Sequence, residues 1–139
     1  MNRRTLRKHA FSIIYQLSFH ETLDLDAAAE DYFLYCGDLT ESDRAFVYEE
    51  IHGTLDHLAE IDALIARCAK GWRLDRLSTV DLAVMRMAAN EILYRPDIPT
   101  GVAINEAVNL CKIYGDDDSP RFVNGVLSKI ASISQAAAH

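Results

Sequence analysis

The residues best suited to bind a polyanion lie on the first helix that the sequence predicts, at about residues 4–18. Projected at about 100° per residue, its bases and aromatic rings fall within an arc of roughly 140°, away from the apolar stripe of Leu6, Ile13 and Leu17. This set comprises Arg3, Arg4, Arg7, Lys8, Phe11 and Tyr15. Guanidinium groups bind phosphates and aromatic rings stack on unpaired bases, so the face suits single-stranded nucleic acid.

A purely structural interpretation explains the same pattern. The basic start of the chain would then be solvated, and Phe11 and Tyr15 would pack against neighbouring helices. The position of a residue on an isolated helix does not distinguish the two interpretations, because it does not show which neighbours cover that face.

Sequence patterns of catalytic and metal sites are missing. The chain has no Gly-rich phosphate loop, nucleophile elbow or HExxH motif, and its three cysteines lack CxxC spacing. The run Asp116-Asp117-Asp118 lacks the glycine and the distal glutamate of a calcium loop, which favours helix capping. We therefore expect a protein that binds rather than catalyses, with no metal and no cofactor.

The net charge of −7 is unevenly distributed along the chain. Residues 21–62 contain thirteen acids and a single base, Arg44, whereas residues 63–95 contain six bases and three acids. Most of such a surface repels polyanions, so one can bind only at a local basic face.

The composition predicts one cytoplasmic domain. With 139 residues, half of them apolar, the chain can bury a core without disulfides or metal. No run approaches the roughly 18 apolar residues that span a bilayer, so no membrane contact is expected. The basic start and the apolar stretch after it lack the small-residue cleavage site of a signal peptide.

Apolar residues recur at helical spacing through most of the chain, which predicts an all-α fold. Six helices are expected, at about residues 4–18, 26–35, 40–70, 78–95, 101–114 and 119–135. Thr40 with Asp43 and Ser78 with Asp81 have the spacing of capping boxes, and Gly53 is a candidate bend. We expect two packed three-helix bundles, at about 1–71 and 78–135, within one domain.

Two blocks near the C-terminus are long, ordered and specific. The first reads Val102-Ala-Ile-Asn-Glu-Ala-Val-Asn-Leu-Cys-Lys112, and the second reads Phe122-Val-Asn-Gly-Val-Leu-Ser-Lys129. Together with Tyr114-Gly115 and Ser119 between them, they resemble the NusB family of bacterial transcription antitermination factors. The opening from Arg3-Arg4 to Tyr15-Gln16 fits the same family, so the resemblance covers nearly the whole chain, although residues 23–58 match only in helical pattern and length.

The resemblance implies an all-α fold of two three-helix bundles and no catalysis. It implies binding of the boxA element of ribosomal RNA leader transcripts together with NusE, a ribosomal protein of the small subunit. This complex would load onto RNA polymerase with other Nus factors, suppress termination and assist ribosomal RNA maturation.

The resemblance also implies site residues, by position. Those expected at the RNA are Arg3, Arg4, Arg7, Lys8, Tyr15, Arg86, Asp118 and Phe122. Asp75 and Asp81 match acidic positions that face the basic NusE. Because an acidic run lies near this surface and the first helix has only four bases, we expect weak, salt-sensitive RNA binding in which NusE supplies much of the affinity.

Other hypotheses remain open at this point. The acidic segment 21–62 could make the protein a helical adaptor between other proteins, with the basic helix incidental. The RNA-targeting part of some RNA methyltransferases also resembles the NusB family, but no Rossmann motif follows the predicted bundles. Some family members form homodimers and others are monomers, and the sequence does not choose between them.

Overall fold

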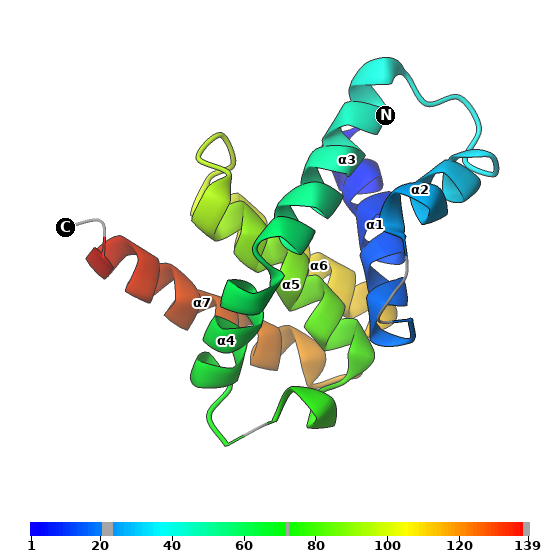
Figure 1. Ribbon diagram of the computed structural model, residues 1–139. Coiled ribbons are helices and arrows are strands. Elements are labelled where there is room, and N and C mark those ends of the chain that lie inside the picture. The colour runs from blue at the N-terminus through cyan, green and yellow to red at the C-terminus, as the bar shows by residue number, and fades with distance from the viewer. Residues whose placement is uncertain (21–23, 72, 138–139) are drawn as a thin grey trace.

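The computed structural model describes residues 1–20, 24–71 and 73–137, which form helices and no strands (Figure 1). The α-helices are α1 Arg3–Tyr15, α2 Leu25–Phe33, α3 Glu41–Asp56, α4 Leu58–Cys68, α5 Thr79–Tyr94, α6 Thr100–Tyr114 and α7 Ser119–Ala137. Two short 3-10 turns, η1 Gln16–Ser18 and η2 Leu74–Arg76, follow α1 and precede α5. The predicted all-α class is confirmed, and no helix in these ranges is long and apolar enough to cross a membrane.

Capping residues predicted from the sequence lie at the starts of two helices, α3 and α5. The Thr40 hydroxyl accepts from the Asp43 amide at 3.0 Å and the Asp43 carboxylate accepts from the Thr40 amide at 3.1 Å, which confirms the predicted capping box at α3. At α5 only half of the predicted pair forms, because Ser78 accepts from the Asp81 amide and no return bond from the Ser78 amide occurs. The Asp81 carboxylate is left for another role.

The predicted third helix is wrong in one respect, because the segment divides into α3 and α4 at His57, where φ is −117° and ψ is 18°. Apolar residues continue at helical spacing across the break, so periodicity does not reveal it. Gly53 lies within α3 and is not the bend. A Cβ at Gly53 would lie 2.5 Å from the side-chain oxygen of Asn90, so the glycine allows α3 to approach α5 closely.

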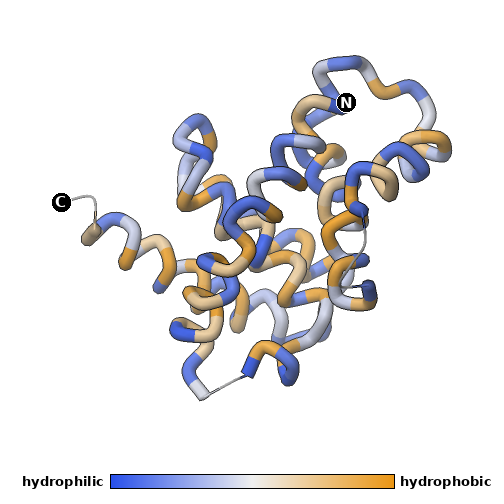
Figure 2. Tube along the Cα trace, viewed as in Figure 1, coloured by the Kyte–Doolittle hydropathy of each residue, from blue (hydrophilic) through white to orange (hydrophobic). Residues whose placement is uncertain are grey.

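Helix α5 lies at the centre of the molecule (Figure 1). It packs against α1, α3, α4, α6 and α7. Because α3 also contacts α1 and α4, and α7 also contacts α4 and α6, these helices surround α5 in the order α1, α3, α4, α7, α6. Apolar and polar residues alternate along the helices (Figure 2), and the apolar faces meet in one continuous core. The boundaries of the two predicted bundles stay a prediction.

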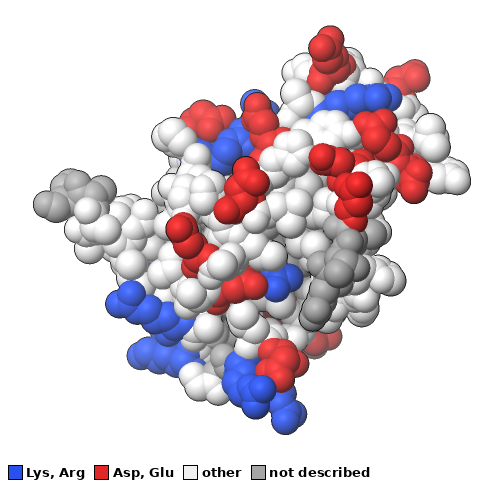
Figure 3. Space-filling model, viewed as in Figure 1, with Lys and Arg blue, Asp and Glu red and all other residues white. Residues whose placement is uncertain are grey.

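Charge is segregated on the surface, as Figure 3 shows. Acidic side chains spread over α2 and α3, whereas basic side chains gather near the end of α4 and the adjoining connection to α5. A polyanion is therefore repelled from the α2–α3 side of the molecule.

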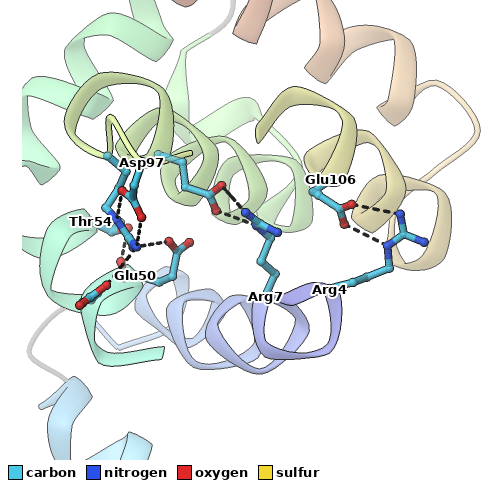
Figure 4. A network of polar contacts seen from close by, with 9 residues as sticks. Arg4, Arg7, Glu50, Thr54, Asp97 and Glu106 are labelled. Carbon is cyan, nitrogen blue, oxygen red and sulfur yellow. Dashed lines mark hydrogen bonds and ion pairs between the residues drawn. The ribbon is translucent and has the colours of Figure 1, made fainter. Parts of the chain in front are cut away.

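A buried network of charged groups joins α1, α3 and α5 (Figure 4). The Arg7 guanidinium donates to both Glu91 carboxylate oxygens, from Nε to Oε2 and from Nη2 to Oε1 at 3.1 Å each. Arg95 Nη1 donates to Glu50 Oε1 at 2.9 Å, while Glu50 Oε2 has no partner among the described residues. Burial raises the pKa of Glu50 well above its usual range, and the negative charge of Glu91 adds to the effect.

Glu50→Gln is expected to flatten the dependence of stability on pH. The folded chain holds the Glu50 proton more tightly than the unfolded chain, whose carboxyl has a pKa of about 4.3. The stability from this group is therefore complete below that pKa and is lost as the pH rises through the raised pKa of the folded state. Urea unfolding from pH 5 to 8 should show that the free energy of unfolding of the variant rises relative to that of the wild type toward pH 8.

The matched control is Glu49→Gln. Glu49 also contacts Arg95, with Glu49 Oε2 3.0 Å from Arg95 Nη2, but its side chain is exposed. This control should keep the pH dependence of the wild type. If Glu50→Gln keeps it as well, the buried carboxyl is not the group responsible.

Candidate nucleic-acid interface

Three bases on the outer side of α1 form the basic face of α1, which we define as Arg3, Arg4 and Lys8. The Arg3 guanidinium lies over the ring of Phe46, 4.4 Å from its centroid. Arg4 is 58% exposed at its side chain and forms two hydrogen bonds, at 3.0 and 3.1 Å, to Glu106 of α6. Lys8 is half-buried one turn further along. The Arg3 guanidinium therefore lies on the α3 side of α1, and the Arg4 guanidinium lies on the α6 side.

Arg7 was predicted to contact RNA, but the structure buries its side chain in the interior. It is 5% exposed and its guanidinium lies between α1 and α5, bound to Glu91. Helix α1 is covered by α3 as well as by α5, so its buried arc is wider than its apolar stripe. Arg7 fixes the position of α1 and is not available to a ligand.

The aromatic residues of α1 divide between the two interpretations of the sequence. Phe11 is buried and stacks on Tyr114 of α6, with ring centroids 5.3 Å apart, so it belongs to the packing. Tyr15 is half-buried, contacts Phe19 edge-on and places its hydroxyl 3.3 Å from the Thr79 hydroxyl at the start of α5. Tyr114 itself stays 46% exposed. Tyr15 on α1 and Tyr114 on α6 thus leave part of their aromatic rings accessible.

A hollow of about 330 Å³ lies where α5 and α7 begin, and we call it the α5–α7 hollow. It is lined by Arg76, Leu77, Ser78, Asp81, Asp116, Asp118, Ser119 and Phe122. Asp118 and Phe122 were predicted to contact RNA, and Asp81 was predicted to contact NusE. The structure brings all three residues together in this hollow. Thr79 joins this hollow to α1, because it follows Ser78 and contacts Tyr15.

Asp81 lies inside this hollow rather than on an outer surface. It is 7% exposed, and its Oδ1 atom has no hydrogen-bond partner among the described residues. Burial raises the pKa of Asp81, and the charge of Asp116 raises it further, against the opposing hydrogen bond with Ser119. A group that donates a hydrogen bond or carries positive charge would satisfy this buried oxygen on entering the hollow.

Two further predicted residues have different positions. Arg86 was expected on or beside the RNA surface, but its guanidinium binds Asp62 of α4 at 2.8 and 2.9 Å and its side chain is 12% exposed. Helix α4 does not adjoin α1 around α5, so Arg86 lies away from the basic face of α1. Asp75 is exposed in η2 and pairs with Arg73 at 3.1 Å. Its contact with a partner stays a prediction.

Sequence reasoning missed Tyr114 and Arg76. Tyr114 lies at the end of the predicted helix 101–114 and within the family motif, yet nothing local indicates that it stacks on Phe11. Arg76 is exposed and, among the described residues, is the one basic side chain that lines the α5–α7 hollow. The sequence shows that basic residues become frequent after residue 63, but it does not show where any one of them lies in the fold. Across residues 1–20, 24–71 and 73–137, no cluster of three or more His, Cys, Asp or Glu side chains could hold a metal ion.

Basic side chains and aromatic rings on neighbouring helices, with a hollow lined by one more ring, can bind a single strand of nucleic acid. The cations bind its phosphates and the rings stack on its nucleobases. The model of the NusB family matches residues 4–132 of the chain. The chain belongs to the NusB family.

Relatives and solved structures of the family extend over nearly the full length. The transcription antitermination protein NusB of Agathobacter rectalis is 42% identical, with 94% of this chain and all of the relative covered. The structure of T. maritima NusB superimposes with a TM-score of 0.88 at 36% identity, covering 95% of this chain and 92% of that one. A structure of the antitermination factors NusB and NusE in complex with dsRNA shares the fold, with a TM-score of 0.85 at 23% identity over 94% of this chain and 96% of that one.

Proposed function

We propose that this protein is an RNA-binding transcription antitermination factor that binds boxA-type ribosomal RNA leader sequence together with NusE. The observation that carries the proposal is the basic face of α1 in a chain of the NusB family, on a helix that also carries Tyr15 and packs through Phe11 on Tyr114 of α6. The protein acts in the cytoplasm by binding, without catalysis, in a complex of RNA polymerase with other Nus factors. It promotes antitermination and ribosomal RNA maturation.

Backbone phosphates bind to Arg3, Arg4 and Lys8. The Arg4 guanidinium is held by Glu106 in the free protein, and although the Glu106 side chain is only 14% exposed, the guanidinium itself is open to solvent. A phosphate can therefore replace Glu106 or share the guanidinium with it. These contacts position the RNA and carry no sequence information.

Aromatic rings bind the unstacked bases. Tyr15 is half-buried at the end of α1, and Phe122 lines the α5–α7 hollow that adjoins it through Thr79. Stacking on such rings contributes roughly 1–3 kcal/mol per base. Asp118, on the rim of the same hollow, lies beside the RNA and weakens binding by repelling phosphates.

NusE binds at the neighbouring acidic residues. Asp75 is exposed before α5, and the unpartnered Oδ1 of Asp81 within the hollow can accept from a basic side chain of NusE. The solved complex of NusB and NusE with dsRNA has the same fold as this chain, which makes NusE and RNA a coherent pair of ligands. The acidic side chains that spread over α2 and α3 repel RNA (Figure 3).

Fluorescence anisotropy with a labelled boxA-type RNA tests the proposal. We expect the protein alone to bind weakly, with an affinity that falls steeply as salt rises, and NusE to raise the affinity by at least tenfold. Equal affinity with and without NusE would refute the role of the partner. No binding under either condition would refute the proposed function itself, and a scrambled RNA of the same length is the control for sequence preference.

A further inference from the structure

A second basic surface lies between α4 and α7. There the end of α4 and the middle of α7 enclose a hollow of about 460 Å³, which we call the α4–α7 hollow. It is lined by Arg67, Cys68, Lys70, Ser128, Lys129, Ser132 and Ile133. Each charged side chain that the described part of the chain contributes to this lining is positive.

The three cations of this hollow are uncompensated. Within the described part of the chain, Arg67, Lys70 and Lys129 have no carboxylate within 4.0 Å, and all three are exposed. By contrast, Arg4, Arg7, Arg86 and Arg95 each pair with a carboxylate. Unpaired like charges that converge on a concave surface raise its positive potential and attract anions.

The convergence of three like charges is unfavourable without a ligand. Arg67 lies in the last turn of α4, and Lys70 lies just beyond the end of the helix. The backbone of Lys70 has φ of 35°, a left-handed conformation that is uncommon for residues other than glycine, and Gly71 continues the turn with φ of 79°. A bound anion would offset the repulsion between these cations.

The α4–α7 hollow is separate from the basic face of α1. Helix α1 packs on α2, α3 and α5, whereas α7 packs on α4, α5 and α6, so the two surfaces lie on opposite sides of α5. Figure 3 shows basic side chains gathered over the end of α4, at a distance from the acidic α2–α3 side. One helix connects the sites, because α7 carries Phe122 in its first turn and Lys129 about two turns later.

We propose that the α4–α7 hollow binds backbone phosphates of RNA that extends beyond the basic face of α1, an inference that rests on the proposed function. Arg67, Lys70 and Lys129 pair with the phosphates, and the hydroxyls of Ser128 and Ser132 donate hydrogen bonds to phosphate oxygens. Because no aromatic ring among the described residues lines this hollow, the phosphate contacts there carry no sequence information. Longer transcripts therefore bind more tightly than the boxA element alone.

The test compares two RNAs in the presence of NusE. One is a boxA-type RNA of about 12 nucleotides, a length within the site sizes of single-strand binders, and the other carries the same element with a tail of about 20 uridines. The wild type should bind the tailed RNA at least tenfold more tightly. The triple variant Arg67→Gln, Lys70→Gln, Lys129→Gln should lose this gain and keep its affinity for the short RNA.

The salt dependence gives a second readout. Each phosphate contact to a single strand contributes about 0.7 to the slope of log affinity against log salt, so the triple variant should lose about 2 with the tailed RNA. Lys129→Gln alone should lose about 0.7. Its matched control is Arg44→Gln, which also removes one exposed cation but lies on α3 among acids and should leave the slope unchanged.

The outcomes separate this inference from the proposed function. If the wild type binds the short RNA but the tail adds no affinity, or if the triple variant retains the gain, the α4–α7 hollow does not bind RNA. If the wild type binds neither RNA, both proposals fail together. A labelled oligoglutamate that binds the wild type and not the triple variant, with RNA affinities unchanged, would assign the hollow to an acidic protein segment instead.

Discussion

Arg7→Ala is expected to lower the free energy of unfolding by about 3–5 kcal/mol, the cost of leaving one partner of a buried ion pair uncompensated. Arg7 and Glu91 are 5% and 1% exposed and share two-point hydrogen bonding. Without the guanidinium, the Glu91 carboxylate would remain buried near a second carboxylate, Glu50, with only Arg95 to balance them. Urea unfolding at pH 7, followed by circular dichroism, measures the loss.

Two variants show whether charge or volume explains this loss. The double variant Arg7→Met, Glu91→Leu removes both charges and fills the space, so it should recover most of the stability. Arg3→Ala removes an exposed arginine four residues earlier and should change stability by less than about 1 kcal/mol. An Arg7→Ala protein as stable as Arg3→Ala would show that the buried pair does not hold α1 in place.

Replacing all three bases of the basic face of α1 is expected to lower RNA affinity about 100-fold near 0.1 M salt. The variant is Arg3→Ala, Arg4→Ala, Lys8→Ala, and its reason is the loss of three phosphate contacts, which together contribute about 2 to the salt slope. Anisotropy titrations of a boxA-type RNA with NusE, at several salt concentrations, give the affinity and the slope in one series. The melting curve should stay close to that of the wild type, since these side chains lie outside the core.

The matched control is again the double variant Arg7→Met, Glu91→Leu, which also removes one arginine from α1. Because Arg7 is buried, this protein should keep the salt slope of the wild type. If it loses affinity as the triple variant does, Arg7 contacts RNA after all. If the triple variant keeps both affinity and slope, RNA binds elsewhere on the molecule.

Features that depend on neighbours in sequence were predictable. The Thr40 and Asp43 capping box needs only a hydroxyl and a carboxylate three residues apart, and the structure has it. The stripe of apolar residues likewise gave α1, α5 and α6 to within a few residues. The predicted helix 101–114 also ends at Tyr114, followed by Gly115 as the C-cap.

Features that depend on distant segments were not predictable. Arg4 and Arg7 lie close together on a helical projection, yet Glu106 holds one at the surface and Glu91, 84 residues away in sequence, holds the other in the core. Asp81 looked like a residue that caps its own helix, but the fold places its carboxylate in a hollow made with α7. The break at His57 is invisible because the apolar pattern continues across it.

Contacts within the free protein also affect the entropy of RNA binding. Arg3 rests on Phe46 and Arg4 is held by Glu106 at two points, so neither guanidinium samples all of its rotamers before a ligand arrives. Side chains that are already restrained lose less conformational freedom when they bind. A flexible RNA strand therefore meets arginine side chains that are already oriented. Most of the conformational entropy lost on association is then lost by the RNA.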